Sequence, residues 1–259
     1  MHWVIQNHFF SQVYFDTLCR QLESYGISYS CVQVSASLLQ IKPEIESQES
    51  LIIVMGSSSL GKIAKQRKWT PGYFDNNLDY RLYMQHYGSD MLNEQAVIAP
   101  LGQLQPAWEK FFIRPVSDKK TFSGTVMNCA EFSDMQQHAA TDIGQQPSAV
   151  AFDQNDIVVI APLQTIYAEY RFWVVDARIV TSSRYRLGKK GMFSSDVDER
   201  ITAFAQKQID KWQPDRAFVI DIADTEDGLK VIEINAINSS ALYAANAGKL
   251  INAIEAMSF

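Results

Sequence analysis

Cysteine and histidine are scarce in this sequence, and neither type occurs in the spacing of a metal-binding motif. The three cysteines, Cys19, Cys31 and Cys129, are odd in number and far apart, and the four histidines show no ligand spacing. This pattern excludes a disulfide framework and argues against zinc chemistry. It is typical of free thiols in a reducing compartment, so we expect a cytoplasmic protein.

Long apolar runs and an excess of basic residues are also absent. No apolar run approaches the length of a membrane-spanning helix, and the first five residues lack the basic region and apolar stretch of a signal peptide. The formal net charge of -6 provides no overall attraction to nucleic acid or to an anionic membrane surface. We therefore expect neither as a partner. The sequence also has no Gly-x-Ser-x-Gly element, so a hydrolase of that kind is not indicated.

The composition is that of an ordinary globular protein, with 47% apolar and 20% charged residues. In the first third, short apolar runs alternate with a helical pattern, which predicts a small α/β domain over residues 1–95. We expect the following elements in it: strands at residues 3–6, 27–34 and 51–55, a helix at 9–24, and a connecting helical segment at 73–93.

From residue 96 onward the pattern changes to strands followed by helices. Antiparallel strands are expected at residues 97–98, 111–114, 157–160, 169–175, 178–184, 218–223 and 229–235, and amphipathic helices at 198–212 and 241–257. This segregated order predicts an α+β domain over residues 96–259, with lobes at about 96–160 and 161–259.

The most informative segment is a predicted hairpin over residues 219–235. A three-residue loop at 226–228, with Gly228 in the left-handed conformation, would place Thr225 opposite Leu229. Counting back along both strands then places Asp221 opposite Glu233. Because side chains alternate between faces, Asn235 shares their face. The other face carries four isoleucines that can be buried: Ile220, Ile222, Ile232 and Ile234.

Two carboxylates that oppose each other across a strand pair repel, which a purely structural hairpin would avoid. A divalent cation between them removes the repulsion, and carboxylate and amide oxygens are the ligands that magnesium takes beside substrate phosphates. We therefore predict a magnesium site formed by Asp221, Glu233 and Asn235. The alternative is a solvated hairpin with surface acids.

Several short motifs occur in an order and spacing that resemble one known family. They are residues 71–74 (PGYF), 112–115 (FIRP), 118–124 (DKKTFSG), 169–172 (EYRF), 183–185 (SRY) and 233–239 (EINAINS). With these motifs the chain resembles ATP-grasp proteins, and most closely a branch with Arg-Pro where many relatives have Lys-Pro. The resemblance implies an ATP-grasp fold, in which two lobes of antiparallel sheet and helices clamp ATP, behind a small α/β domain. It also implies ATP and Mg²⁺ as cofactors.

The resemblance assigns nucleotide contacts to the first lobe and to the hinge. It implies that Arg114 reaches the ATP phosphates, where a guanidinium offers several donors, and that Lys120 lies in a loop closing over them. At the hinge, Ile160, Pro162 and Leu163 would meet the adenine. The structural alternatives are a surface ion pair for Arg114, a solvated lysine, and a plain core strand end at the hinge.

In the second lobe, the resemblance implies that Glu169 contacts the ribose or the nucleotide rim and that Arg171 lies near the phosphates. A salt-bridged pair at a sheet surface is the alternative for these two residues. Asn238 follows the metal residues in the same motif and is likewise assigned to the nucleotide.

One departure from the family concerns the charge near the metal site. Many ATP-grasp ligases have an arginine two residues before the first metal acid, and here that position is Val219. Arg184 and Arg186, expected on one strand face, are candidates to supply this charge to the transferring phosphoryl group or to an acidic substrate. Residues 236–240 (AINSS) also replace the Pro-Gly stretch of many ligases, so those ligases do not indicate the acceptor pocket.

Residues 56–62 (GSSSLGK) nearly match a different nucleotide motif, the P-loop. However, Ile63 stands where that motif needs Ser or Thr to hold magnesium, and Pro71-Gly72 soon ends the basic stretch that follows. We therefore expect a strand-to-helix turn at residues 56–59, which could line the acceptor site.

Two functions from different classes remain open. The first is a ligase in which Mg²⁺-ATP phosphorylates a small-molecule or peptide carboxylate and an amine attacks the acyl phosphate, giving an amide or peptide-like bond. The second is a nucleotide-binding regulatory or interaction module without turnover. The presence of Asp221, Glu233 and Asn235 together favours the enzyme, whereas Val219 favours the module.

Overall fold

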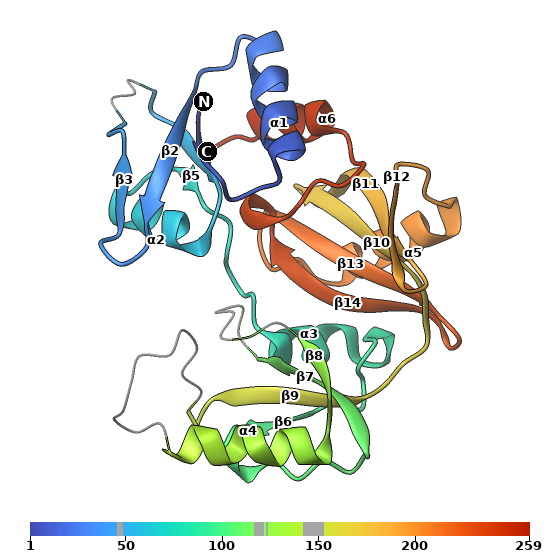
Figure 1. Ribbon diagram of the computed structural model, residues 1–259. Coiled ribbons are helices and arrows are strands. Elements are labelled where there is room, and N and C mark those ends of the chain that lie inside the picture. The colour runs from blue at the N-terminus through green and yellow to red at the C-terminus, as the bar shows by residue number, and fades with distance from the viewer. Residues whose placement is uncertain (46–48, 117–121, 123, 142–152) are drawn as a thin grey trace.

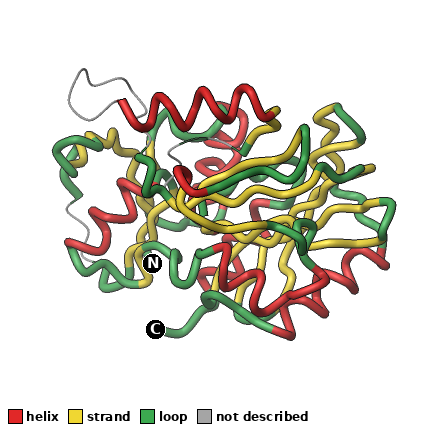
Figure 2. The backbone as a smooth tube through the Cα atoms, turned by 90° about the horizontal axis from the view of Figure 1, so that it is seen from below, coloured by secondary structure: helices red, strands yellow, loops and turns green. Residues whose placement is uncertain are grey.

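The computed structural model describes residues 1–45, 49–116, 122, 124–141 and 153–259. Three sheets organise the described chain, with most helices lying outside the strands (Figures 1 and 2). The first sheet is mixed and belongs to the N-terminal third, and the other two are antiparallel. The predicted α+β class is therefore confirmed.

The first sheet has the strand order β3-β2-β1-β4-β5. Its strands are β1 (His2–Gln6), β2 (Tyr29–Ser35), β3 (Gln40–Lys42), β4 (Ile52–Met55) and β5 (Pro71–Gly72). It is accompanied by α1 (Gln12–Ser24) and α2 (Ser58–Gln66). β1 and β4 pair in parallel, and their apolar side chains are buried because helices cover both faces of such a sheet.

The near match to a P-loop has a packing explanation. Helix α2 begins at Ser58, and its N-cap Ser57 accepts a hydrogen bond from the Leu60 backbone N–H, so Gly61 and Lys62 lie inside the helix. A Cβ atom on Gly61 would lie 2.8 Å from the ring of Tyr73. The glycine therefore allows Tyr73 to pack against α2, and no glycine-rich phosphate loop precedes the helix.

The second sheet has the order β6-β9-β7-β8. Its strands are β6 (Val97–Pro100), β7 (Lys110–Pro115), β8 (Thr125–Asn128) and β9 (Ile157–Pro162). Helix α4 (Cys129–Thr141) packs on it through Phe132, whose ring lies 5.4 Å from that of Phe111. The sequence did not predict β8 or α4.

The third sheet has the order β12-β11-β10-β13-β14. Its strands are β10 (Ile166–Val175), β11 (Arg178–Leu187), β12 (Lys190–Ser194), β13 (Ala217–Thr225) and β14 (Gly228–Ala236). Helices α3 (Tyr80–Tyr87) and α5 (Glu199–Lys211) share a buried apolar cluster with it. The segment predicted to be helical at 73–93 forms only α3 and one 3-10 turn, Gly88–Asp90.

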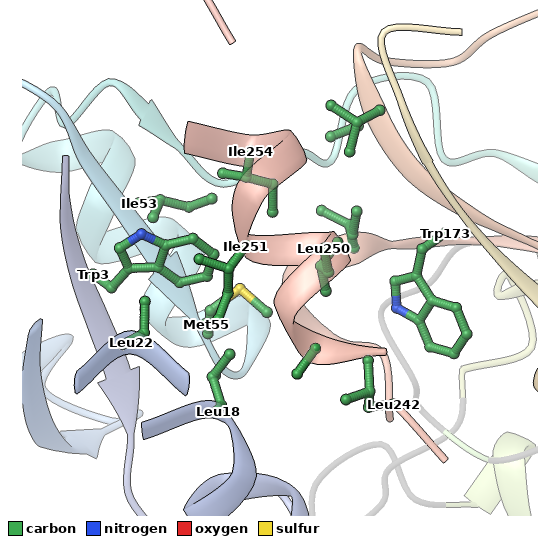
Figure 3. Close-up of a cluster of buried hydrophobic side chains, with 14 of the residues drawn as sticks. Trp3, Leu18, Leu22, Ile53, Met55, Trp173, Leu242, Leu250, Ile251 and Ile254 are labelled. Carbon is green, nitrogen blue, oxygen red and sulfur yellow. The ribbon is translucent and has the colours of Figure 1, made fainter. Parts of the chain in front are cut away.

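Helix α6 (Ala247–Glu255) joins the first sheet to the third. Its Leu250, Ile251 and Ile254 belong to one core cluster with Trp3 of β1 and Trp173 of β10 (Figure 3). The helix is shorter than the predicted 241–257, because residues 240–246 instead run along β11. Two hydrogen bonds hold that segment there: Ala244 N donates to Ser183 Oγ at 3.2 Å, and Asn246 N donates to Thr181 Oγ1 at 2.8 Å.

Candidate nucleotide-binding site

A cleft of about 670 Å³ lies between the second and third sheets, a size typical of small-molecule sites. Its lining comes from three regions: the β7–β8 side, the hinge after β9, and one face of the third sheet. The lining residues are Leu92, Asn93, Phe112, Arg114, Pro115, Phe122, Gly124, Thr125, Val126, Pro162, Leu163, Gln164, Ile166, Glu169, Arg171, Tyr185, Arg186, Ile232, Glu233, Asn235, Ser239 and Ser240. The segment at 56–59 is not among them.

An ion pair crosses this cleft from sheet to sheet. Arg114 Nη1 on β7 donates to Glu233 Oε2 on β14 at 2.6 Å, and the guanidinium lies 5.2 Å from the centre of the Tyr80 ring. Asn235 Nδ2 donates to the other carboxylate oxygen of Glu233 at 2.9 Å. Burial raises the pKa of Glu233, but Arg114 and Asn235 outweigh it, so the net pKa lies below its usual value. Glu233 is therefore an ionised group facing the cleft.

Asp221 faces Glu233 as predicted, but a different partner occupies its carboxylate. Arg171, its neighbour across the β10–β13 pair, donates from Nε to Oδ1 at 2.8 Å and from Nη2 to Oδ2 at 2.7 Å. Asp221 is 1% exposed and does not line the cleft. Burial raises the pKa of Asp221, and the Arg171 guanidinium opposes that shift. The predicted placement of Asp221 as an open metal ligand is therefore wrong for this structure.

The register of the hairpin is confirmed, although its turn differs from the prediction. Thr225 pairs with Gly228, so the turn is one residue shorter than expected. A register shift between Asp221 and Ile222 restores the Asp221–Glu233 pair. The extra residue is Ile232, which consequently lines the cleft and does not join the buried face as predicted.

The structure also explains the missing arginine at position 219. Val219 is fully buried in the core cluster that α6 completes, where a charged side chain would lack a partner. Arg171 instead places a guanidinium beside Asp221 from the neighbouring strand. Its guanidinium lies over the rings of Tyr185, at 5.5 Å, and Tyr243, at 5.2 Å.

Arg184 and Arg186 do not share a face as expected. A register shift separates them, because Arg184 pairs with Tyr170 and Arg186 pairs with Glu169. Arg186 lines the cleft and donates from Nη1 to Glu169 Oε1 at 2.5 Å, whereas Arg184 is not a lining residue. Alternation along β11 is interrupted there, so the prediction for Arg184 is wrong and Tyr185 lines the cleft beside Arg186.

Two other residues assigned to the nucleotide lie elsewhere. Ile160 is 1% exposed and belongs to the core cluster of the second sheet, while its neighbours Pro162 and Leu163 do line the cleft. Asn238 is fully buried, where its Oδ1 accepts from the Phe74 N–H at 2.9 Å and its Nδ2 donates to the Val54 carbonyl at 2.7 Å. Its side chain joins the first sheet to the end of β14. Lys120 lies outside the described residues.

The sequence missed several residues of the cleft wall, among them Phe112, Tyr185 and Ser240. A Cβ atom on Gly124 would lie 2.5 Å from the Phe112 ring, so the glycine in the DKKTFSG motif allows close packing on that ring. This spacing was the available signal for Phe112. Tyr185 lies inside the SRY motif, where its position beside Arg184 and Arg186 was the available signal.

The family comparison completes the identification. A family model for an ATP-grasp domain, the third family of its clade, matches residues 63–254. The chain belongs to the ATP-grasp family. This match accounts for the cleft between two antiparallel sheets and for the residues that converge on it from β7, β10 and β14. No curated protein matches the chain in sequence.

Solved structures show the same fold at low sequence identity. D-alanine--D-alanine ligase from Bacillus anthracis, complexed with ATP, has a TM-score of 0.65 at 10% identity, covering 98% of this chain and 96% of its own. D-cycloserine synthetase DcsG has a TM-score of 0.64 at 11% identity, covering 98% of both chains. The ATP-grasp ligase PsnB, complexed with a minimal precursor, has a TM-score of 0.58 at 11% identity over 98% of both chains.

Two further findings concern the described residues as a whole. None of the helices in that part of the chain has the length and apolarity to cross a membrane. Within the same residues, no group of three or more histidine, cysteine, aspartate or glutamate side chains is arranged to hold a metal ion by itself.

Proposed function

We propose that the protein is an ATP- and Mg²⁺-dependent ligase that joins a carboxylate to an amine through an acyl phosphate. The observation that carries the proposal is the convergence of Arg114, Glu233 and Asn235 in the cleft of an ATP-grasp protein. The solved structures named above include ligases, and one of them is complexed with ATP. In this proposal the cleft is the nucleotide site, with Pro162 and Leu163 beside the adenine.

The donor set fits magnesium held jointly with phosphates. Glu233 offers an ionised carboxylate and Asn235 an amide oxygen, and magnesium is usually bound by one or two protein oxygens together with substrate phosphates. These two residues would hold the ion, which would offset negative charge on the phosphates. Asp221 would act indirectly, by fixing the guanidinium of Arg171 toward the cleft.

The arginines supply the remaining charge. In the free protein each one that lines the cleft is paired, with Glu233, Asp221 or Glu169. We propose that Arg114 exchanges Glu233 for a phosphate oxygen when the nucleotide binds. Arg171 keeps its bidentate partner, so it offers a fixed positive charge at low reorganisation cost.

The reaction balances without a further reactant. A substrate carboxylate oxygen attacks the γ-phosphorus, the bond from that phosphorus to the β-bridging oxygen breaks, and ADP leaves. The amine nitrogen then attacks the acyl carbon, the bond from carbon to the phosphate oxygen breaks, and phosphate leaves while the nitrogen loses a proton. The protein contributes positioning and charge stabilisation, with no covalent intermediate of its own.

The second candidate is a nucleotide-binding module without turnover. Two observations favour it: Val219 replaces the arginine of many ligases, and Arg171 occupies the carboxylate of Asp221. Both candidates bind the nucleotide in the same cleft, so only turnover separates them.

The distinguishing experiment incubates the protein with Mg²⁺-ATP and pooled carboxylates and amines, and follows ADP and phosphate. The ligase proposal predicts release that depends on the added substrates and is abolished in Glu233→Gln. Glu226→Gln, an exposed carboxylate in the turn of the same hairpin, is the matched control and should retain full activity. Full ADP release from Glu233→Gln would remove Glu233 from the mechanism. Nucleotide binding with no release under any condition would support the module.

A further inference from the structure

Three aromatic rings form a continuous series from the cleft to the surface, which we call the aromatic wall: Tyr185, Tyr243 and Phe193. Tyr185 lines the cleft and stacks on Tyr243, with centroids 5.0 Å apart and an interplanar angle of 16°. The Phe193 ring lies 5.1 Å from that of Tyr243 on the outer side. Phe193 is 60% exposed and Tyr243 37% exposed, so large apolar surfaces face solvent next to the cleft.

The chain holds this wall in place at some conformational cost. Tyr243 has a φ of 52°, in the left-handed region that aromatic residues rarely adopt. The two hydrogen bonds from Ala244 and Asn246 to side chains of β11 fix the segment and place Tyr243 over Tyr185. Unusual backbone conformations that the surrounding structure maintains are concentrated at binding sites.

The position of the wall relates it to the reacting end of the cleft. Glu233 and Asn235 lie on β14, and the chain continues from that strand through Ser239 and Ser240, which both line the cleft. Tyr243 follows three residues later. A carboxylate activated at the γ-phosphate would therefore have the wall on its far side from the adenine hinge.

Charge does not provide an alternative basis for selecting the substrate side chain. Each charged side chain in the described lining of the cleft is already in an ion pair: Arg114 with Glu233, Arg186 with Glu169, and Arg171 with Asp221. Placing an additional charged group among them would leave it without a partner of its own. The surface that remains available beside the reacting end is aromatic and apolar.

We propose that the aromatic wall selects the amine acceptor, which carries an aromatic or branched aliphatic side chain that packs on Tyr243 and Phe193. This inference rests on the proposed ligase function, because it assigns a place to the second substrate of that reaction. Packing of one more ring or aliphatic group on exposed aromatic faces contributes both buried area and ring contacts.

The test measures binding of amine probes by calorimetry to protein loaded with Mg²⁺ and the non-hydrolysable analogue AMP-PNP. L-phenylalanine and L-leucine should bind at least about tenfold more tightly than L-aspartate and L-lysine. Phe193→Ala should weaken L-phenylalanine binding about fivefold to tenfold, with AMP-PNP affinity unchanged. Phe193 is the useful position because its ring contacts Tyr243, whereas the Arg171 guanidinium lies over Tyr185 and Tyr243. The matched control is Phe259→Ala, which replaces a half-exposed phenylalanine outside the cleft lining and should change nothing.

Different failures have different meanings in this experiment. If AMP-PNP binds but L-phenylalanine and L-leucine do not, or if L-aspartate or L-lysine binds as tightly, the inference is overturned while the nucleotide site stands. An unchanged L-phenylalanine affinity in Phe193→Ala also overturns it. If AMP-PNP itself does not bind, the proposed function fails and the inference fails with it.

Discussion

Arg114 and Glu233 are separated by 119 positions in the sequence and joined by a contact of 2.6 Å between Nη1 and Oε2. The pair connects the second sheet to the third across the cleft, and both side chains are largely buried, at 15% and 26% exposure. In the free protein each group therefore occupies the place that a ligand of opposite charge would take. Nucleotide phosphates and a cation can replace both partners at once, which keeps every charge compensated.

The first prediction concerns the buried pair of Arg171 and Asp221. Asp221→Ala leaves a buried guanidinium without its carboxylate, so we expect the free energy of unfolding to fall by about 3–5 kcal/mol. Asp224→Ala is the matched control on the same strand, because the Arg200 side of its pair is 62% exposed. That variant should lose at most about 1 kcal/mol. Chemical denaturation of both variants checks the difference, and equal losses would contradict the structural role assigned to Asp221.

The second prediction separates the two arginines of β11. Arg186 lines the cleft and Arg184 does not, so Arg186→Ala should lower the catalytic rate about 100-fold, or about 3 kcal/mol, with a smaller change in ATP affinity. Arg184→Ala should retain most of the activity. Steady-state rates of ADP release test this ranking. A larger rate loss in Arg184→Ala would show that the register shift between them does not decide which arginine acts.

The third prediction contrasts two asparagines three residues apart. Asn238→Ala removes the partner of the buried Phe74 N–H and Val54 carbonyl, and each unsatisfied group costs about 1–3 kcal/mol. It should therefore lower the unfolding free energy while the folded protein binds nucleotide normally. Asn235→Ala should do the reverse, because that side chain lines the cleft. Denaturation and nucleotide titration of both variants measure the two effects. Weaker nucleotide binding by stable Asn238→Ala would restore its assignment to the nucleotide.

The fourth prediction is a pH dependence that originates in the first sheet. Burial lowers the pKa of His2 from 6.5, with Glu49 opposing, while the ring contacts Ser28 Oγ at 2.6 Å and Ser30 Oγ at 3.0 Å. The unfolded chain therefore takes up this proton first as the pH falls. The contribution of His2 to stability is complete above pH 6.5 and is lost as the pH falls toward the folded pKa.

His2→Gln should accordingly lose less stability than the unmodified protein between pH 7.5 and 5. Denaturation curves at several pH values within this range give the comparison. Identical pH profiles for the two proteins would show that His2 does not contribute to the acid sensitivity of the fold.

Much of the fold was predictable because alternating and helical apolar patterns are local. The strands of the third sheet and helix α5 lie within a few residues of their predicted positions, and the register of Asp221 with Glu233 was predicted correctly. That success involved two compensating errors, however. The turn is one residue shorter and the strand contains one extra residue at Ile232, and a pattern of alternating side chains contains no signal for either.

The errors in the candidate site have the same physical origin. The register shift at Arg184 and Arg186 breaks the alternation on which their shared face was predicted. Asn238 follows the metal motif closely in sequence, but a 3-10 turn at Ile237–Ser239 directs its side chain toward Val54 and away from the cleft. Contacts between distant segments, such as those of Arg171 with Asp221, determine which charges remain available, and no local pattern contains them.

The most direct test of the nucleotide site is a titration with Mg²⁺-AMP-PNP of the unmodified protein, Arg114→Ala and Lys62→Ala. Arg114 lines the cleft, whereas Lys62 lies in α2 at the sequence that resembles a P-loop. We predict that Arg114→Ala weakens binding by about 1.5–3 kcal/mol, the scale of a hydrogen bond to a charged group, and that Lys62→Ala leaves it nearly unchanged. The opposite ranking would contradict a nucleotide site between the second and third sheets and would locate it at residues 56–62.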